Sequence, residues 1–264
     1  MALQFCSFAS GSSGNCYLIK SESSAVIIDA GISGKKIFQS LADTGTALED
    51  VKALLITHEH IDHVKSIPIL SKKIPGIGVY ANERTWENIQ RPVAAEKRRT
   101  FTTGEDFYID DLLIRPFAIP HDAAEPVGFS IYHGDSQISI VTDVGYITDE
   151  IFEEIVDADL LLLEANHEEE ILLMGSYPYS LKRRILSDEG HLSNVNAGKC
   201  LCKISATKDK QRQVLLGHLS HENNDPQVAM LAVRNELLEN DIIPGNDLKL
   251  DVALRDCCSL IYEV

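Results

Sequence analysis

Long apolar runs are missing from this sequence of 264 residues. No stretch approaches the roughly 20 consecutive apolar residues that a membrane-spanning helix requires. The N-terminal residues also do not combine a basic region with the apolar segment of a secretory signal. These absences predict a soluble, cytoplasmic protein that does not associate with membranes.

Cysteine pairs with zinc-finger spacing are missing as well. The chain has six cysteines, but Leu201 alone separates Cys200 from Cys202, and Cys257 is adjacent to Cys258. Neither pair has the Cys-x-x-Cys spacing of a structural zinc site. Without a secretory signal the thiols are expected to stay reduced, so a disulfide or zinc-finger framework is disfavoured.

Positive charge is scarce. The 24 basic residues face 40 acidic ones, which gives a formal net charge of -16. Phosphate neutralisation supplies most non-specific affinity for nucleic acids, so this chain should not coat them indiscriminately. Local basic runs remain candidates for a substrate track, with a solvated surface as the alternative for each: residues 72–73, 97–99, 182–184 and 208–212.

The apolar pattern predicts one layered α/β domain. A hydrophobic content of 44% is ample for a core, and no low-complexity linker divides residues 1–264. Period-two and continuous apolar segments predict strands over 3–8, 16–19, 25–28, 53–57, 79–81, several within 107–141, 159–164, 213–217 and 257–264. Helical spacing predicts helices over 33–43, 64–73, 83–90, 168–186 with a break at Pro178, a run ending at 205, and 227–238, while 91–103 is expected to be irregular.

The densest group of potential metal ligands follows the expected strand 53–57. His58, His60, Asp62 and His63 fall within six residues. In extended backbone His58 and His60 point to the same side and could hold one ion, whereas Asp62 and His63 lie where the chain turns. This spacing favours two neighbouring metal sites. A solvated histidine-rich loop is the alternative, but it would crowd four ligand-type side chains without a function.

Three later residues have the chemistry to complete such a centre. His121, Asp143 and His218 each follow an expected strand, and the carboxylate of Asp143 could bridge two ions. His221 competes with His218 for the last position, and a structural role is preferred for His133.

Two further features flank this centre. Asp29 ends the strand 25–28 and is a candidate hydrogen-bond acceptor for a metal-binding histidine, with a helix-capping role as the alternative. The loop of residues 10–15 is rich in Gly and Ser and could present backbone N–H groups to a phosphate. A tight turn that needs glycine for steric reasons is an equal alternative.

The pattern His58-x-His60-x-Asp62-His63 resembles the metal-binding signature of the metallo-β-lactamase fold. Motifs along most of the chain resemble the YycJ/WalJ family of that fold: residues 10–15, 29–31, 57–60, 163–167, 177–178, 190–194 and 217–220. The resemblance implies a four-layer αββα sandwich and a DNA exonuclease of 5′ to 3′ polarity. Asp143 stands where true β-lactamases have a cysteine, which argues against antibiotic hydrolysis. The chain between Asp143 and His218 is too short for the extra domain of β-CASP nucleases.

The resemblance also implies how the site is divided. It implies two divalent metal ions, zinc or manganese with iron as a further option, that cleave phosphodiester bonds. The first ion would be held by His58, His60 and His121, the second by Asp62, His63 and His218, with Asp143 bridging. Asp62, Glu164 and His191 would be catalytic, with His191 as general acid oriented by Glu164, as in the tRNA 3′-processing branch.

The expected substrate is a nucleic acid, with DNA favoured. Candidate substrate contacts are Ser12, Asn15, Asn166, Asn194, Arg183 and Arg184. One alternative is a small-molecule hydrolase that acts on a lactone, a thioester or a cyclic phosphodiester, because the same metals can activate water toward a carbonyl. Another is a non-catalytic binding module that retains the fold. The sequence does not predict an oligomeric state.

Overall fold

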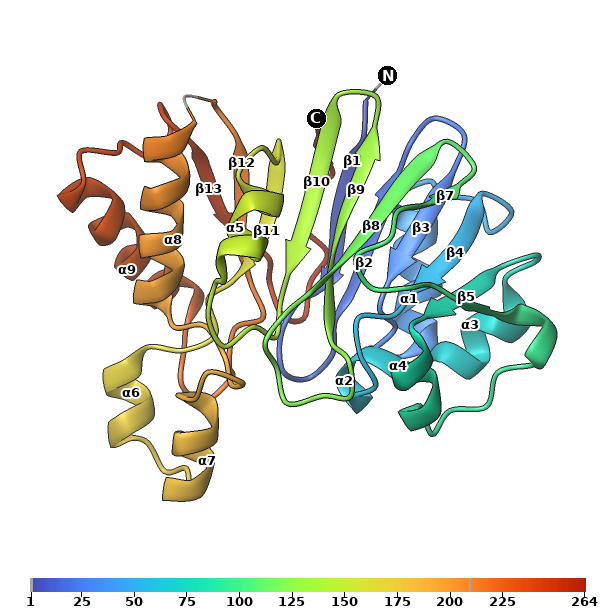
Figure 1. The fold of residues 1–264 in the computed structure, drawn as a ribbon, viewed down its shortest axis with the longest axis horizontal. Helices are drawn as coiled ribbons and strands as arrows, with labels where there is room; N and C mark the ends of the chain where they lie inside the picture. The colour runs from blue at the N-terminus through green and yellow to red at the C-terminus, as the bar shows by residue number, and fades with distance from the viewer. Residues whose placement is uncertain (1, 209) are drawn as a thin grey trace.

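The chain forms two mixed sheets packed face to face, with helices on both outer faces (Figure 1). The computed structural model describes residues 2–208 and 210–264, so that Met1 and Asp209 lie outside the described residues. No helix in the described part of the chain is long and apolar enough to cross a membrane. The layer order of helices, sheet, sheet and helices confirms the predicted αββα sandwich.

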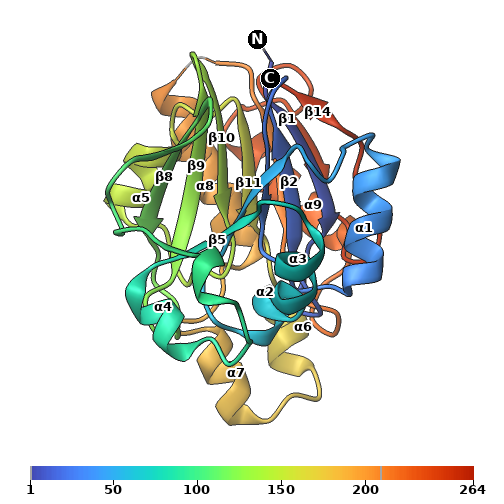
Figure 2. The ribbon, with the colours of Figure 1, turned by 90° about the vertical axis from the view of Figure 1, so that its right-hand side faces the viewer.

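Six of the seven strands of the first sheet come from the N-terminal half of the chain. Its strand order is β14-β1-β2-β3-β4-β5-β6, with antiparallel pairing from β14 to β3 and parallel pairing from β3 to β6. The strands are β1 (Gln4–Ala9), β2 (Cys16–Lys20), β3 (Ala25–Ile28), β4 (Val51–Leu55), β5 (Gly78–Ala81), β6 (Arg98–Thr100) and β14 (Tyr262–Glu263). The last strand returns the C-terminus to β1, beside the N-terminus (Figure 2).

The second sheet has the order β13-β12-β11-β10-β9-β8-β7. Pairing is antiparallel from β7 to β10 and parallel from β10 to β13. The strands are β7 (Phe107–Ile109), β8 (Leu112–Ala118), β9 (Val127–His133), β10 (Ser136–Val141), β11 (Leu160–Glu164), β12 (Gln213–Gly217) and β13 (Lys249–Val252). All five residues of β11 are buried, as expected for a parallel strand that is covered on both faces.

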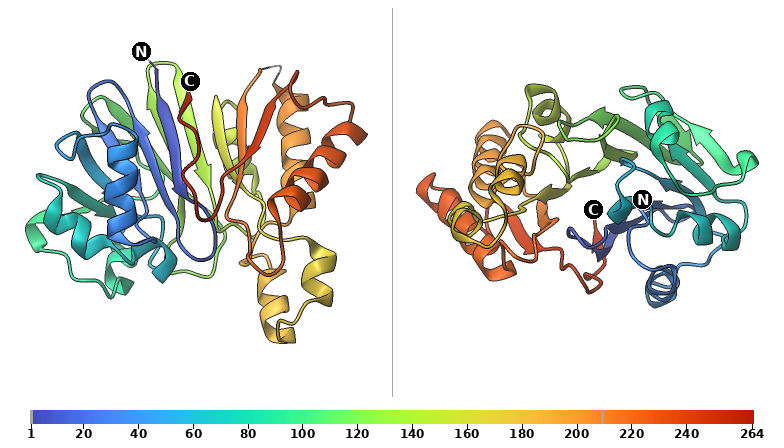
Figure 3. Two further views of the ribbon diagram at one scale, coloured as in Figure 1. Left: turned by 180° about the vertical axis from the view of Figure 1, so that it is seen from behind. Right: turned by 90° about the horizontal axis from the view of Figure 1, so that it is seen from below.

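Helices cover the outer face of each sheet, and three apolar clusters join the four layers. The first sheet carries α1 (Gly34–Asp43), α2 (Ile61–Val64), α3 (Ile67–Lys73), α4 (Glu83–Asn88) and the 3₁₀ turn η1 (Ala95–Lys97). The second carries α5 (Asp149–Ile155), α8 (Asn194–Thr207) and α9 (Pro226–Glu239), while α6 (Glu169–Met174) and α7 (Tyr179–Ile185) project beyond the sheets (Figure 3).

The structure corrects several expected elements. The helix expected over 64–73 is divided into α2 and α3, and the region 91–103 contains η1 and β6 instead of irregular chain. Strand β6 is fully exposed and has no apolar alternation to reveal it. Helix α5 and strand β13 were not predicted, and the expected strand 257–264 shortens to β14. The start of α5 could have been predicted from Thr148, a residue type that is common at helix N-caps. Its side chain accepts the backbone N–H of Ile151.

One glycine fixes the position of the metal-ligand loop. A Cβ atom on Gly31 would lie 1.6 Å from the carbonyl oxygen of Asp62. The backbone N–H of Asn15 donates to the same oxygen at 2.8 Å, and Gly31 N–H donates to the Asn15 carbonyl at 2.8 Å. The loops after β1, β3 and β4 are thus locked together, and only glycine permits this approach.

Candidate metal centre

The candidate ligands come from the carboxyl ends of strands in both sheets. Strands β3, β4, β10, β11 and β12 end at the same side of the sandwich (Figure 1). The residues that follow them bring together Asp29, the His58–His63 loop, Asp143, Glu164 and His218. Ligand sites in α/β folds form outside the carboxyl ends of parallel strands, which is the arrangement seen here.

Three of these strand-end residues have left-handed backbone. The φ angles are 58° for Asp29, 59° for Asp143 and 54° for His218. This conformation is uncommon outside glycine, although Asp and His tolerate it better than most residues. Backbone strain of this kind concentrates at functional sites. Here it turns each side chain sharply from its strand toward the centre.

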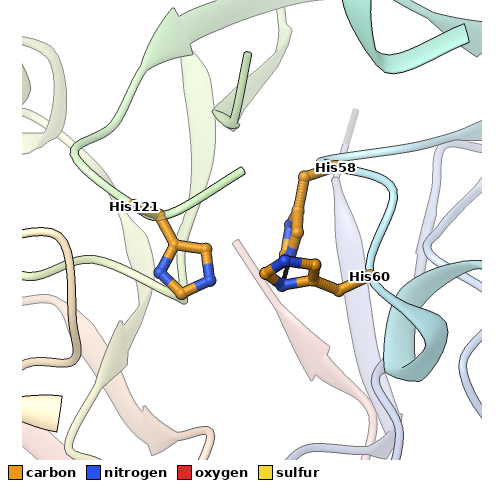
Figure 4. Close-up of side chains that lie close together, drawn as sticks. All are labelled: His58, His60 and His121. Carbon is orange, nitrogen blue, oxygen red and sulfur yellow. Dashed lines mark hydrogen bonds between the residues drawn. The ribbon is translucent and has the colours of Figure 1, made fainter. Parts of the chain in front are cut away.

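The first cluster consists of His58, His60 and His121. His58 Nε2 lies 3.1 Å from His60 Nδ1, and the His121 ring lies 5.1 Å and 5.2 Å from their ring centres. One nitrogen of each ring lies within 4.8 Å of the others. Figure 4 shows the three rings converging on one point between the loops.

The second cluster consists of Asp62, His63, Asp143 and His218. His63 Nε2 lies 3.2 Å from an oxygen of Asp143 and 3.5 Å from Asp62. His218 Nε2 lies 3.9 Å from Asp62. Asp143 also approaches the first cluster, since its other oxygen lies 3.8 Å from His121 Nε2. A carboxylate in this position can reach two ions at once.

The outer contacts of the histidines fix which nitrogen faces inward. In four of them Nδ1 contacts an outer oxygen, which leaves Nε2 for the interior. The contacts are His58 with Thr57 Oγ1 at 3.0 Å, His63 with Asp29 at 2.7 Å, His121 with the Gly190 carbonyl at 3.2 Å and His218 with Glu164 at 2.8 Å. Such outer partners set the tautomer and ring orientation of metal-binding histidines. The predicted contact of Asp29 with a ligand histidine is therefore present.

The donor set fits divalent metal ions. His121 Nε2, Asp143 Oδ2 and His218 Nε2 are buried and have no hydrogen-bond partner among the described residues. Buried polar atoms are normally satisfied, so these atoms require a cation or another ligand. Two nitrogens bound to one tetrahedral zinc at about 2.0–2.1 Å would be roughly 3.3 Å apart. The separation of 3.1 Å between His58 and His60 matches this geometry.

The electrostatics of the two clusters differ. Burial and the neighbouring His63 lower the pKa of His58 well below its ordinary value, so it is a neutral ring with a free lone pair. Burial alone would lower the pKa of His218, but Asp143, Asp62 and Glu164 raise it to about 10. The carboxylates of the second cluster therefore favour a positive charge between them. Metal binding there must release protons.

Glu164 connects a metal-facing histidine to His191. One oxygen of Glu164 lies 2.8 Å from Nδ1 of both His191 and His218, and the other accepts the backbone N–H of Val144 at 2.7 Å. Burial opposes ionisation, but His191 and His218 lower the pKa of Glu164 to about 2. The ionised carboxylate orients both rings. His191 Nδ1 also lies 3.9 Å from Asp143, so it could instead join a metal group with Asp143, Glu164 and His218.

Three side chains that were expected to contact the substrate instead form hydrogen bonds inside the protein. Asn15, Asn166 and Asn194 are at most 3% exposed. Asn15 Nδ2 lies 3.1 Å from His63 Nε2 and its Oδ1 accepts the N–H of Gly11. The amide of Asn166 donates to the His218 carbonyl, and that of Asn194 donates to Glu168. These three amides therefore stabilise the loops around the centre. Ser12, in contrast, is exposed at the tip of its loop.

The two candidate arginines differ. Arg183 is exposed on α7, but Arg184 forms a two-point ion pair with Asp122 through Nε and through Nη2, the latter at 2.8 Å. Asp122 lies beside His121, and its carboxylate is 3.4 Å from His121 Nε2. No local pattern indicated this role of Asp122, because its partner is 62 residues away. Arg184 is therefore not a free phosphate contact in this structure.

Other candidates lie away from the centre. His221 is exposed and contacts Glu222, and His133 is the last residue of β9, 3.3 Å from Asp111. Of the basic run 208–212, Lys208 and Lys210 pair with Asp157 and Asp159, Arg212 is buried, and residue 209 lies outside the described residues. This run therefore offers no substrate track among its described residues.

The sequence is similar to a family model and to known proteins. Residues 24–218 match the family model described as the Beta-lactamase superfamily domain. The chain is 37% identical over 261 residues to exodeoxyribonuclease WalJ of Streptococcus pneumoniae, covering 97% of this chain and 96% of that protein. It is 35% identical over 253 residues to exodeoxyribonuclease YycJ of Bacillus anthracis, covering 95% of each.

Solved structures show the same fold. The metallo-β-lactamase fold protein YhfI of Bacillus subtilis superposes with a TM-score of 0.75 at 16% identity over all of both chains. Zinc-bound PqqB of Methylobacterium extorquens gives a TM-score of 0.67 at 16% identity, covering 97% of this chain and 99% of that one. At this identity the likeness concerns the fold alone.

Replacing Asp29 with Asn should weaken metal binding. The substitution removes the charge that holds His63 Nδ1–H, and loss of such an outer partner typically costs 10–100-fold in metal affinity. Competition with a coloured chelator measures this affinity. Asp111→Asn is the matched control, since Asp111 contacts His133 far from the centre. Equal affinities for both variants and the unmodified protein would limit Asp29 to a structural role.

Proposed function

The chain belongs to the β-lactamase superfamily and, within it, to the WalJ/YycJ family, and from this premise we propose that it is a single-domain, metal-dependent exonuclease acting on DNA. The polarity would be 5′ to 3′, as the family resemblance implies. A DNA substrate also fits the cytoplasmic location that the sequence predicts. The observation that most supports the proposal is the Glu164–His191 pair, which lies against the candidate metal ligands.

The metal ligands are proposed as two sets. His58, His60 and His121 would hold one ion, Asp62, His63 and His218 the other, and Asp143 would bridge them. Zinc or manganese suits this set of imidazoles and carboxylates, and iron is also compatible. When bound, two such ions lower the pKa of water and neutralise charge on the phosphoryl group.

The proton for the leaving group would come from His191. Its Nδ1 contacts Glu164 at 2.8 Å, so Nε2 is the nitrogen left to face a substrate. The ring is 15% exposed, whereas Glu164 is fully buried. The buried Glu164 carboxylate holds the orientation of this ring. Asp62, which is 21% exposed at the edge of the second cluster, would orient the attacking water.

The proposed activity should appear on linear DNA supplied with manganese or zinc. Duplex DNA labelled at the 5′ end should lose its label before DNA labelled at the 3′ end, and closed circular DNA should stay intact. A chelator should abolish the reaction. Parallel assays with a lactone, a thioester and a cyclic phosphodiester test the alternative. Hydrolysis of one of these with intact linear DNA would replace the nuclease proposal.

Two metal ions should be found in protein purified without chelator. Asp143→Ala should lower the content to one ion or fewer, because it removes the carboxylate that approaches both clusters. Elemental analysis gives the stoichiometry, and Asp135→Ala in the exposed turn between β9 and β10 is the control. A content that never exceeds one ion under metal-replete conditions would contradict the bridging role.

The general-acid role of His191 predicts a substrate-dependent loss. His191→Ala should retain both metals and cleave DNA about 10²- to 10⁴-fold more slowly, the usual contribution of positioned proton transfer. It should keep most of its activity on bis(p-nitrophenyl) phosphate, because nitrophenolate leaves without protonation. His133→Ala, which removes a remote carboxylate-bound histidine, serves as the control. Metal loss, or equal slowing on both substrates, would place His191 among the ligands instead.

A further inference from the structure

A cavity of about 400 Å³ lies beside the chain segment that follows His218. One wall is the loop between β12 and α9, and the other is the segment that follows β13. The lining residues used below are Leu219, Pro226, Leu254, Arg255 and Asp256. Pockets for small organic ligands begin at roughly 300 Å³ and combine apolar walls with a few polar groups. The cavity has both properties.

The cavity and the metal centre share two loops. Leu219 directly follows His218 and pairs with Gly11 in an isolated β-bridge. The hydroxyl of Ser10 accepts the backbone N–H of His218 at 2.8 Å. A Cβ atom on Gly11 would lie 2.9 Å from Cγ of Arg255, so the arginine stem packs against this loop. The tip of the loop, Ser12–Ser13, is exposed. On one side of the tip Gly11 lies against Arg255, and on the other Asn15 Nδ2 lies 3.1 Å from His63 Nε2.

Arg255 supplies a cation at this position, and only part of its hydrogen-bonding capacity is used. Its side chain is 27% exposed, and its Nε lies 3.2 Å from Asp256, whose side chain is 69% exposed. No described residue accepts a hydrogen bond from its two terminal nitrogens. An exposed pair of this kind contributes little free energy, so a stronger anion can replace Asp256. The guanidinium fork matches a phosphate with two parallel hydrogen bonds.

The charges around the cavity allow an anion. Asp225 is occupied as the cap of α9, where its carboxylate accepts the N–H of Gln227 at 2.8 Å. Lys36 adds a second cation, since its Nζ donates to the Asp256 carbonyl at 2.6 Å. Of the two carboxylates that line the cavity, Asp225 is engaged as a helix cap, so Asp256 is the one that an anion would displace from Arg255. The apolar walls formed by Leu219, Pro226 and Leu254 suit a flat, uncharged ring.

We propose that this cavity is a subsite for one unpaired nucleotide next to the scissile phosphate. The nucleobase lies against the apolar walls, and its phosphate is held by Arg255. This inference rests on the proposed nuclease function. It adds the path that the DNA strand follows beyond the metal ions. The strand crosses the Ser12–Ser13 tip, which makes Ser12 the contact between the two sites.

The test compares two substrates on the metal-loaded enzyme. Thymidine 5′-(p-nitrophenyl phosphate) offers one nucleotide, and a single-stranded thymidine tetranucleotide also fills the subsite. Arg255→Met keeps the aliphatic stem on Gly11 and removes the charge. It should lower kcat/KM for the tetranucleotide about 10- to 100-fold, as expected for hydrogen bonds to a charged group, and reduce the salt slope by about one. Hydrolysis of the mononucleotide ester and metal content should not change.

Arg234→Ala is the matched control, because Arg234 is an exposed arginine on α9 that lines a different groove. It should leave both substrates unaffected. A second measurement follows the fluorescence of a 2-aminopurine phosphorothioate tetranucleotide as it binds, which requires no turnover. Arg255→Met should weaken this binding by the same factor.

The outcomes separate the subsite from the nuclease proposal. If Arg255→Met cleaves and binds the tetranucleotide like the unmodified enzyme, the subsite is wrong and the nuclease proposal stands. If the unmodified enzyme cleaves no DNA but binds the tetranucleotide through Arg255, the subsite stands and the nuclease proposal fails. Equal loss on both substrates, or loss of metal in Arg255→Met, would show that Arg255 only supports the loop and would overturn the subsite.

Discussion

The structure depends on charge compensation at one buried point between the two sheets. Asp143 is 2% exposed and lies among His63, His121 and His218. Burying these groups is costly unless each finds an opposite charge. Bound cations would satisfy the inward nitrogens and carboxylate oxygens together. The outer shell of Asp29, Thr57 and Glu164 then holds the rings in the orientation that the cations require.

A residue of this site can be predicted from the sequence when the pattern that reveals it lies within a few neighbouring residues. The loop from His58 to His63 is recognisable because four ligand types occur within six residues. His121, Asp143 and His218 are each recognisable as polar residues at the end of an apolar strand, and topology brings such ends together. Polar contacts between residues that are far apart in the sequence produce no such local pattern. Nothing near Arg184 in sequence indicates that Asp122 would neutralise it, and nothing marks the amides of Asn166 and Asn194 as buried supports.

The same reasoning explains the errors in the fold. The layered α/β arrangement was predicted because the central strands are continuous apolar segments, such as β11, whereas the four-layer αββα order came from the family resemblance. The edge strands β6 and β13 lack that signal, because all three residues of β6 are exposed and no residue of β13 is fully buried. Their pairing is decided by the neighbouring strand and not by their own composition. Local capping chemistry was the missed clue for α5.

The single oxygen of Glu164 that contacts both His191 and His218 couples the proposed acid to the metal ligands. A change in charge on one ring is therefore felt by the other through the shared carboxylate. Because the ligands span both sheets, from His58 in the first to His218 after β12, they meet only when the two halves of the chain have docked. Metal capture thus becomes a checkpoint of folding. A nascent or partly unfolded chain lacks the complete set of proposed ligands, so a metal-dependent activity can arise only after the two halves have docked.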